Sequence, residues 1–144
     1  MAKLELSRTL SISPDEAWGH VSDLNTLGDW LEMHQGWRGE VPTELAVGTK
    51  VVGVAGAKGL RNRVTWTVKE FDPPKFVVIT GDGVGGAKYK LRMTVAELPK
   101  GCEFTVNIDL GGRPLFGPVG AVAVRAVKGD IERSIRKFEE IYAR

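Results

Sequence analysis

The stretch GDGVGGAKYKLRMTV, residues 81–95, decides how this chain folds. Its first six residues spell G-x-G-x-x-G, a pattern that holds a dinucleotide pyrophosphate when a strand precedes it and a helix follows. Here the glycines are followed by residues that alternate between apolar and polar, which predicts a strand. No helix N-terminus is then available for phosphates, so we expect no dinucleotide cofactor. The glycines are expected to form a wide hairpin, which either only joins two strands or forms a permissive rim beside a pocket.

Short segments of the same kind surround this stretch on both sides. They are separated by turn residues such as Pro42, Asp72-Pro73-Pro74 and Pro99-Lys100-Gly101. This regular punctuation predicts an antiparallel meander of six strands. The six segments are GWRGEV (36–41), GTKVVGVAGA (48–57), LRNRVTWTVKEF (60–71), KFVVITGD (75–82), AKYKLRMTVAEL (87–98) and CEFTVNIDL (102–110).

The N-terminal part of the chain predicts one strand and two short helices. Residues 3–12 alternate strictly and indicate a half-buried strand. Ser13 is a good N-cap, and Glu16 completes a capping box with it, which predicts a helix over about 14–22. A second short helix, capped by Asp23 or Asn25, is expected to end around DWLEM.

The last thirty residues return to helical spacing and predict one long amphipathic helix. Its N-terminal end carries small residues, among them Gly117, Gly120 and Ala121, whereas its later turns carry bulkier ones. This taper suggests a cavity near the glycine-rich loops, and the alternative is that aromatic side chains fill the space. The expected apolar stripe consists of Val119, Val122, Ala123, Ala126, Val127, Ile131, Ile135, Phe138 and Tyr142.

Composition places the chain among ordinary globular domains. Its 144 residues suit a single domain, 1–144, and no apolar run is long enough to span a membrane. A lone cysteine, Cys102, and the lack of a signal peptide favour the cytoplasm. The net charge of +2 gives no reason to expect DNA binding. His20, His34 and Cys102 are too scattered for a zinc motif, so no metal is expected.

The order of strand, two short helices, meander and long C-terminal helix resembles the helix-grip fold of the SRPBCC/START-like superfamily. Within it, the chain is similar to the polyketide cyclase/dehydrase family, and most similar to its actinobacterial toxins of type II toxin–antitoxin systems. The resemblance implies an α+β fold in which a curved antiparallel sheet of about seven strands wraps the long helix and leaves a cavity. The stretches that carry it are SPDEAWGHVSDL (13–24), DWLEMHQGWRGE (29–40), GLRNRVTWTV (59–68), GDGVGGAKYKL (81–91) and LGGRPLFGPVG (110–120).

Alternation along the strands predicts which side chains face such a cavity. Asn62 and Trp66 share one inward face, and the phenol of Tyr89 can donate or accept a hydrogen bond there. For each of them, packing in the core without a ligand is the alternative. The predicted ligand-binding residues are Arg8, Trp37, Asn62, Trp66, Tyr89, Leu91, Phe104, Phe116 and Gly120.

Two residues raise specific questions. Arg8 stands on the apolar face of its strand, so it needs an acidic partner, a route to water or an anionic ligand. His34 lies between Trp30 and Trp37 and, with Tyr89, is a weak candidate for acid–base catalysis. The alternative for His34 is a partly solvated position beside packed tryptophans.

Three functions remain open from the sequence. The first is a module that binds an apolar, lipid- or polyketide-like molecule; the second is a cyclase or dehydratase. The third is an interaction protein, implied by the toxin resemblance, whose partner is an antitoxin. Its candidate surfaces are the GGRPLFGPVG loop and a basic outer face, which otherwise is a solvated surface. The basic residues are Arg61, Arg63, Lys69, Lys88, Lys90 and Arg92.

Overall fold

The computed structural model describes residues 2–57, 60–112 and 117–143. Within them the chain forms one antiparallel sheet, two short helices and one long helix, which is the predicted α+β helix-grip architecture. In chain order the elements are β1 (Ala2–Leu10), α1 (Pro14–Val21), the 3-10 turn η1 (Leu24–Thr26), α2 (Leu27–Trp30), β2 (His34–Arg38), β3 (Lys50–Ala57), β4 (Leu60–Asp72), β5 (Phe76–Gly83), β6 (Lys88–Glu97), β7 (Cys102–Gly111) and α3 (Gly117–Tyr142).

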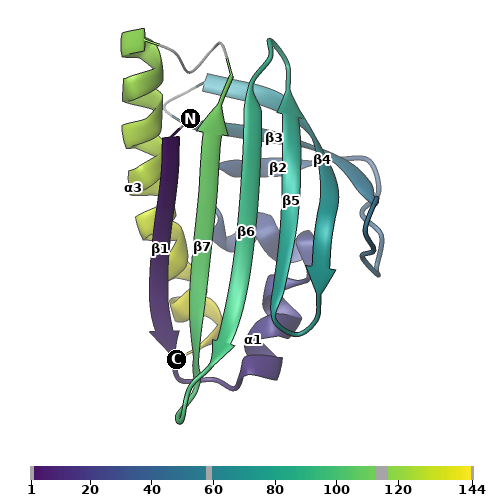
Figure 1. The fold of residues 1–144 in the computed structure, drawn as a ribbon, viewed down its shortest axis with the longest axis vertical. Helices are drawn as coiled ribbons and strands as arrows, with labels where there is room; N and C mark the ends of the chain where they lie inside the picture. Colours follow the sequence, from purple (N-terminus) through teal and green to yellow (C-terminus); the bar gives the residue numbers. More distant parts are fainter. Residues whose placement is uncertain (1, 58–59, 113–116, 144) are drawn as a thin grey trace.

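The seven strands follow the order β1-β7-β6-β5-β4-β3-β2. Strands β2 to β7 form the predicted meander, and β1 returns to pair with β7, with Leu4 opposite Ile108. Figure 1 shows the sheet curling so that β2 and β3 pass behind β5 and β6, while α3 runs alongside β1. The concave face of the sheet and α3 therefore enclose the interior.

The two short helices differ in how closely the sequence predicted them. The Ser13 hydroxyl accepts a hydrogen bond from the Glu16 backbone N–H at 3.2 Å, and α1 begins at Pro14 as expected. The expected second helix is divided into η1 and α2, because Asp23 caps a separate 3-10 turn. Helix α2 ends at Trp30, earlier than predicted, since the next residue is already extended.

Packing, and not only backbone conformation, explains the glycines at 81–86. A Cβ atom added at Gly81 of β5 would lie 2.5 Å from Val64 Cγ1 and 2.9 Å from the ring of Trp66. Both distances are shorter than van der Waals contact, so only glycine leaves room for these β4 side chains. The glycine pattern thus serves the packing of the inward face of the sheet.

Helix α3 carries the taper that its sequence suggested. Val127, Ile131 and Ile135 are buried as predicted. Val122 is 58% exposed, so its assignment to the stripe was wrong. Five residues turn an α-helix by 500°, which places Val122 about 140° away from Val127 around the axis. Gly120 is buried and lies only about 20° from Val127, so it belongs to the inward face.

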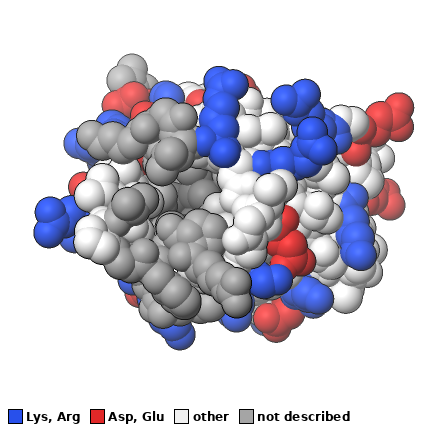
Figure 2. Space-filling view, turned by 90° about the horizontal axis from the view of Figure 1, so that it is seen from above, with Lys and Arg blue, Asp and Glu red and all other residues white. Residues whose placement is uncertain are grey.

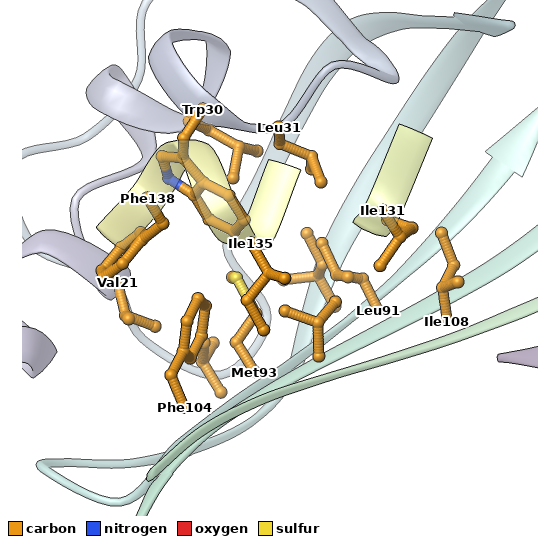
Figure 3. Close-up of a cluster of buried hydrophobic side chains, with 14 of the residues drawn as sticks. Val21, Trp30, Leu31, Leu91, Met93, Phe104, Ile108, Ile131, Ile135 and Phe138 are labelled. Carbon is orange, nitrogen blue, oxygen red and sulfur yellow. The ribbon is translucent and has the colours of Figure 1, made fainter. Parts of the chain in front are cut away.

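Three aromatic side chains fill the interior where α3 ends, and we call this region the aromatic end. Phe104 of β7 lies 4.6 Å from Phe138 of α3, measured between ring centroids, and Trp30 of α2 lies 5.2 Å from Phe138. All three side chains are at most 1% exposed. Figure 3 shows them meeting together with Val21 and Met93. Such edge-to-face and tilted contacts make this end of the core close-packed.

Candidate functional site

The other end of the interior, where α3 begins, is lined by two aromatic side chains held over a glycine. Trp66 of β4 and Tyr89 of β6 both pair with Gly81 of β5, one from each side. Because Gly81 has no side chain, the two rings approach to 5.9 Å between centroids. Trp66 is buried and Tyr89 is half-buried. We call this region the glycine end.

Asn62 lies at the rim of the glycine end, and both ends of its side-chain amide contact protein groups. Its Oδ1 accepts a hydrogen bond from the Val84 backbone N–H at 2.8 Å. Its Nδ2 lies 3.2 Å from the Tyr89 hydroxyl and 3.3 Å from the Val84 carbonyl oxygen. Asn62 therefore fixes the β5–β6 hairpin and the Tyr89 side chain, which makes it a supporting residue of the site.

His34 and Trp37 close the site on the side of β2. The imidazole lies 4.2 Å from the Trp37 ring, and the Trp37 indole N–H donates to the Leu24 carbonyl oxygen at 2.7 Å. His34 faces an internal cavity of about 10 Å³, room for about one water molecule. The cavity is lined by Leu27, Leu31, Met33, His34, Ala55, Trp66 and Leu91.

Burial determines the protonation state of His34. The residue is only 7% exposed, in place of the partly solvated position that the sequence allowed. Desolvation lowers the pKa of His34 from 6.5 to about 4, so its imidazole is neutral at physiological pH. A neutral imidazole has one donor and one acceptor nitrogen, and both can serve a polar group inside an otherwise apolar wall.

The helix side of the glycine end is built from small or half-buried residues. Gly120 is buried on the inward face of α3, and Ala123 and Val124 follow it on the same face. Phe116, another predicted ligand-binding residue, lies outside the described residues.

Two predicted ligand-binding residues lie at the aromatic end. Phe104 is 0% exposed and packs between Trp30 and Phe138, so it belongs to the solid part of the core. The Arg8 guanidinium forms an ion pair with Glu139 of α3, with Nη2 2.7 Å and Nε 2.8 Å from Oε1. This is the acidic partner that the sequence allowed for Arg8.

The structure thus brings together Trp37, Asn62, Trp66, Tyr89 and Leu91 with His34. From the sequence, the glycines of 81–86 were expected to form a connecting hairpin or a pocket rim, and the packing role of Gly81 and Gly83 that makes this possible was not anticipated. Their signal was present, because Gly81 and Gly83 alternate along β5 as inward residues do. The cavity residues Leu27 and Met33 had no such signal, since they come from the irregular segment around α2.

The outer face of the sheet is basic, as predicted from alternation. Arg61, Arg63 and Lys69 are exposed, and Lys88 forms an ion pair with Asp82. The Lys88 ammonium lowers the pKa of the Asp82 carboxyl, with smaller contributions from other lysines nearby. Figure 2 shows several of the molecule's Lys and Arg side chains from the end where α3 begins.

Other kinds of site find little support in the described part of the chain. No group of three or more potential metal ligands occurs among these residues. Cys102 is 0% exposed, and burial raises the pKa of its thiol. Within the described ranges, no helix is both long enough and apolar enough to cross a membrane.

Comparison with known sequences is informative over the whole chain. The family model described as polyketide cyclase/dehydrase and lipid transport matches residues 1–142. A Mycobacterium tuberculosis protein named uncharacterized protein Rv1546 is 51% identical over 99% of both chains. Another protein of that organism, named Toxin Rv0910, is 39% identical over 99% of both chains. These matches confirm both resemblances seen in the sequence, the one to the family and the one to its toxins.

Solved structures confirm the fold. A START superfamily protein from Mycobacterium smegmatis superposes with a TM-score of 0.76, covering 97% of this chain and 96% of that chain at 15% identity. A Thermus thermophilus protein, TTHA0849, also gives a TM-score of 0.76, covering 96% and 95% of the two chains at 18% identity.

Proposed function

Since this chain belongs to the polyketide cyclase/dehydrase and lipid transport family, we propose that it binds an apolar, lipid- or polyketide-like small molecule at the glycine end. The observation that carries the proposal is the row formed by Trp66, Gly81 and Tyr89, where two aromatic rings flank a strand that has no side chain. Opposite this row, α3 carries small residues, whereas at the aromatic end it carries Phe138.

The binding energy would come mainly from apolar contact. Each Å² of apolar ligand surface removed from water contributes about 25 cal/mol. Trp66 and Leu91 supply apolar wall, and the Tyr89 hydroxyl and the His34 imidazole supply polar groups that orient the ligand. Ligand sites commonly combine a mostly apolar lining with a few such polar groups.

Thermal denaturation in the presence of an apolar panel tests the proposal. The panel consists of fatty acids, sterols and aromatic polyketides, each added to purified protein. A ligand at a hundred times its dissociation constant stabilises the fold by about 2.7 kcal/mol. We expect a rise in Tm of several degrees for at least one class, and no rise with any class would contradict the proposal.

A pair of tryptophan variants locates the binding. Trp66→Leu removes the ring at the glycine end, and Trp18→Leu removes a buried ring that contacts Phe71 away from Tyr89. Both changes should lower the Tm of the free protein. Only Trp66→Leu should also weaken the ligand-induced rise, and equal weakening by both variants would contradict the location.

Catalysis as a cyclase or dehydratase is the alternative that the family description favours. His34 and Tyr89 are the titratable side chains that the described part of the site offers for acid–base chemistry. With a pKa of about 4, His34 is a weak base at neutral pH, which argues for a binding role. Turnover of a polyketide that is abolished by both His34→Gln and Tyr89→Phe would favour the enzyme instead.

A toxin role is supported by the 39% identical relative that carries that name. In this second proposal the chain inhibits growth until an antitoxin protein binds it, and the basic outer face is the candidate contact. Expression of the chain alone should slow growth, and co-expression of the adjacent reading frame should restore it. Unchanged growth in both cases would remove this proposal without affecting ligand binding.

A further inference from the structure

The hydrogen bonds around Asn62 determine which end of its amide faces which neighbour. The Val84 backbone N–H can only donate, so the Asn62 atom 2.8 Å away from it must be the acceptor Oδ1. The other end of the amide, Nδ2, therefore points to the Tyr89 hydroxyl at 3.2 Å and the Val84 carbonyl oxygen at 3.3 Å. No alternative orientation satisfies the same three contacts.

This orientation determines whether the Tyr89 hydroxyl donates or accepts in its contact with Asn62. An amide nitrogen only donates, so the Tyr89 oxygen is the acceptor in its contact with Asn62. The phenolic proton must then point elsewhere, and among the described residues no group accepts it. Within the described part of the chain, the Tyr89 O–H is consequently an uncommitted donor beside the Trp66 ring.

The backbone of β5 holds both side chains in this arrangement. A Cβ atom added at Gly83 would lie 2.5 Å from Asn62 Nδ2 and 3.0 Å from a ring carbon of Tyr89. The amide and the ring therefore rest against Gly83, with little freedom to rotate. The direction of the hydrogen bond is built into the rim of the site before any ligand arrives.

From this geometry we infer that the site selects apolar ligands that carry a hydrogen-bond acceptor, such as a ketone or ester carbonyl, over ligands that carry only a donor. The inference rests on the proposed binding function and adds which hydrogen-bonding group the ligand carries. Tyr89 is the contacting residue, and Asn62 is a positioning residue. A ligand N–H that approaches Tyr89 would meet the phenolic proton and lose its own water without replacement, which makes this rim unfavourable for donor groups.

Three tricyclic molecules of nearly equal shape test this selectivity: fluorene has no polar group, fluorenone carries an acceptor and carbazole carries a donor. Equilibrium dialysis against the full chain gives a dissociation constant for each. Comparison of each ligand between wild type and Tyr89→Phe cancels differences in ligand hydrophobicity. We expect Tyr89→Phe to weaken fluorenone about fivefold, the worth of one hydrogen bond. Fluorene should be unchanged, and carbazole should be unchanged or bind more tightly.

Asn62→Asp provides a test that a merely structural role cannot mimic. The new carboxylate only accepts, so it should take the Tyr89 proton and leave the phenolic oxygen free to accept. Fluorenone binding should weaken, and carbazole binding should strengthen relative to wild type. The matched control is Asn25→Asp, the same change at an exposed position in η1, which should alter neither.

The outcomes separate the two proposals. If the tricycles bind but Tyr89→Phe weakens all three equally, or Asn62→Asp leaves the preference for the ketone in place, the polarity inference is overturned and binding stands. If none of the three binds the wild-type chain while a lipid in the panel raises its Tm, the carbonyl of fluorenone brings no advantage and the polarity inference is overturned, whereas ligand binding stands. Binding of none, with no change in Tm for any panel member, overturns both.

Discussion

The aromatic end and the glycine end are enclosed by the same sheet and the same helix, yet they are built differently. At the aromatic end, Phe104 and Phe138 leave no exposed surface and are joined by Trp30. At the glycine end, the facing positions are glycines, and the aromatic rings lie beside them rather than across from helix side chains. One end therefore stabilises the fold, and the other is where we propose that the ligand binds.

Under the proposed function, a helix-grip domain separates stability from binding along a single helix. Changes at the aromatic end are expected to act on folding, whereas changes at the glycine end act on the ligand. The following predictions test that separation, from the largest expected effect to the smallest.

Phe138→Ala should have the largest effect on stability. Removing a fully buried phenylalanine lowers the free energy of unfolding by about 3–5 kcal/mol. Tyr89→Phe keeps the ring and loses one hydrogen bond, so this change should lower the free energy of unfolding by about 1 kcal/mol. Urea denaturation measures both, and comparable losses at the two positions would erase the distinction between the ends.

Gly81→Ala should destabilise the fold although it adds only a methyl group. That group would lie 2.5 Å from Val64 Cγ1, so the expected loss is about 1–3 kcal/mol from overpacking. Gly19→Ala is the control, because nothing lies within 4 Å of its Cβ position in α1. Alanine is a better helix former by about 1 kcal/mol, so the control should gain stability. If Gly81→Ala left the free energy of unfolding unchanged, packing would not require the glycine.

The stability of the fold should depend on pH through His34. Its pKa is about 4 in the folded chain and near 6.5 when unfolded, so protonation favours the unfolded state. The stabilisation that the neutral His34 contributes to the folded state is complete above pH 6.5, and it is lost as the pH falls from there toward 4. Between pH 7 and pH 5 the loss is about 2 kcal/mol.

Urea denaturation of wild type and His34→Gln at both pH values checks this dependence. The variant should lose less stability than wild type between them, and an NMR titration should place the His34 midpoint well below 6. A midpoint near 6.5 would show that the imidazole is solvated.

Arg8→Ala should have the smallest effect. The ion pair with Glu139 is partly exposed, with 38% and 32% of the two side chains accessible, so water and salt screen it. We expect a loss of at most about 1 kcal/mol, which 1 M NaCl should reduce. Affinity for an apolar ligand should not change. A large loss of affinity in Arg8→Ala would place the ligand at the aromatic end instead.

The strands and the long helix were predictable because each rests on a local pattern. Alternation identified β4 to β7, and the capping box located the start of α1. The same alternation placed Asn62, Trp66 and Tyr89 on one inward face. Local patterns do not report which neighbours a side chain meets, so the partner of Arg8 had to come from the folded chain.

The rest of the site depends on contacts that join distant segments. The burial of His34 follows from the segment around α2, where neither helical nor strand spacing is continued. Val122 was assigned to the buried face because it is apolar, although its angular position on the helix places it away from that face. Although Gly81 and Gly83 alternate as inward residues do, their packing role became visible only when β4 and β6 were placed on either side of β5.

The most direct test of the account uses the tryptophans as reporters. In a titration of ¹⁵N-labelled protein with fluorenone, each indole N–H gives its own signal. The Trp66 signal should shift with ligand concentration while that of Trp30 stays in place. Movement of the Trp30 signal with an unchanged Trp66 signal would contradict the account.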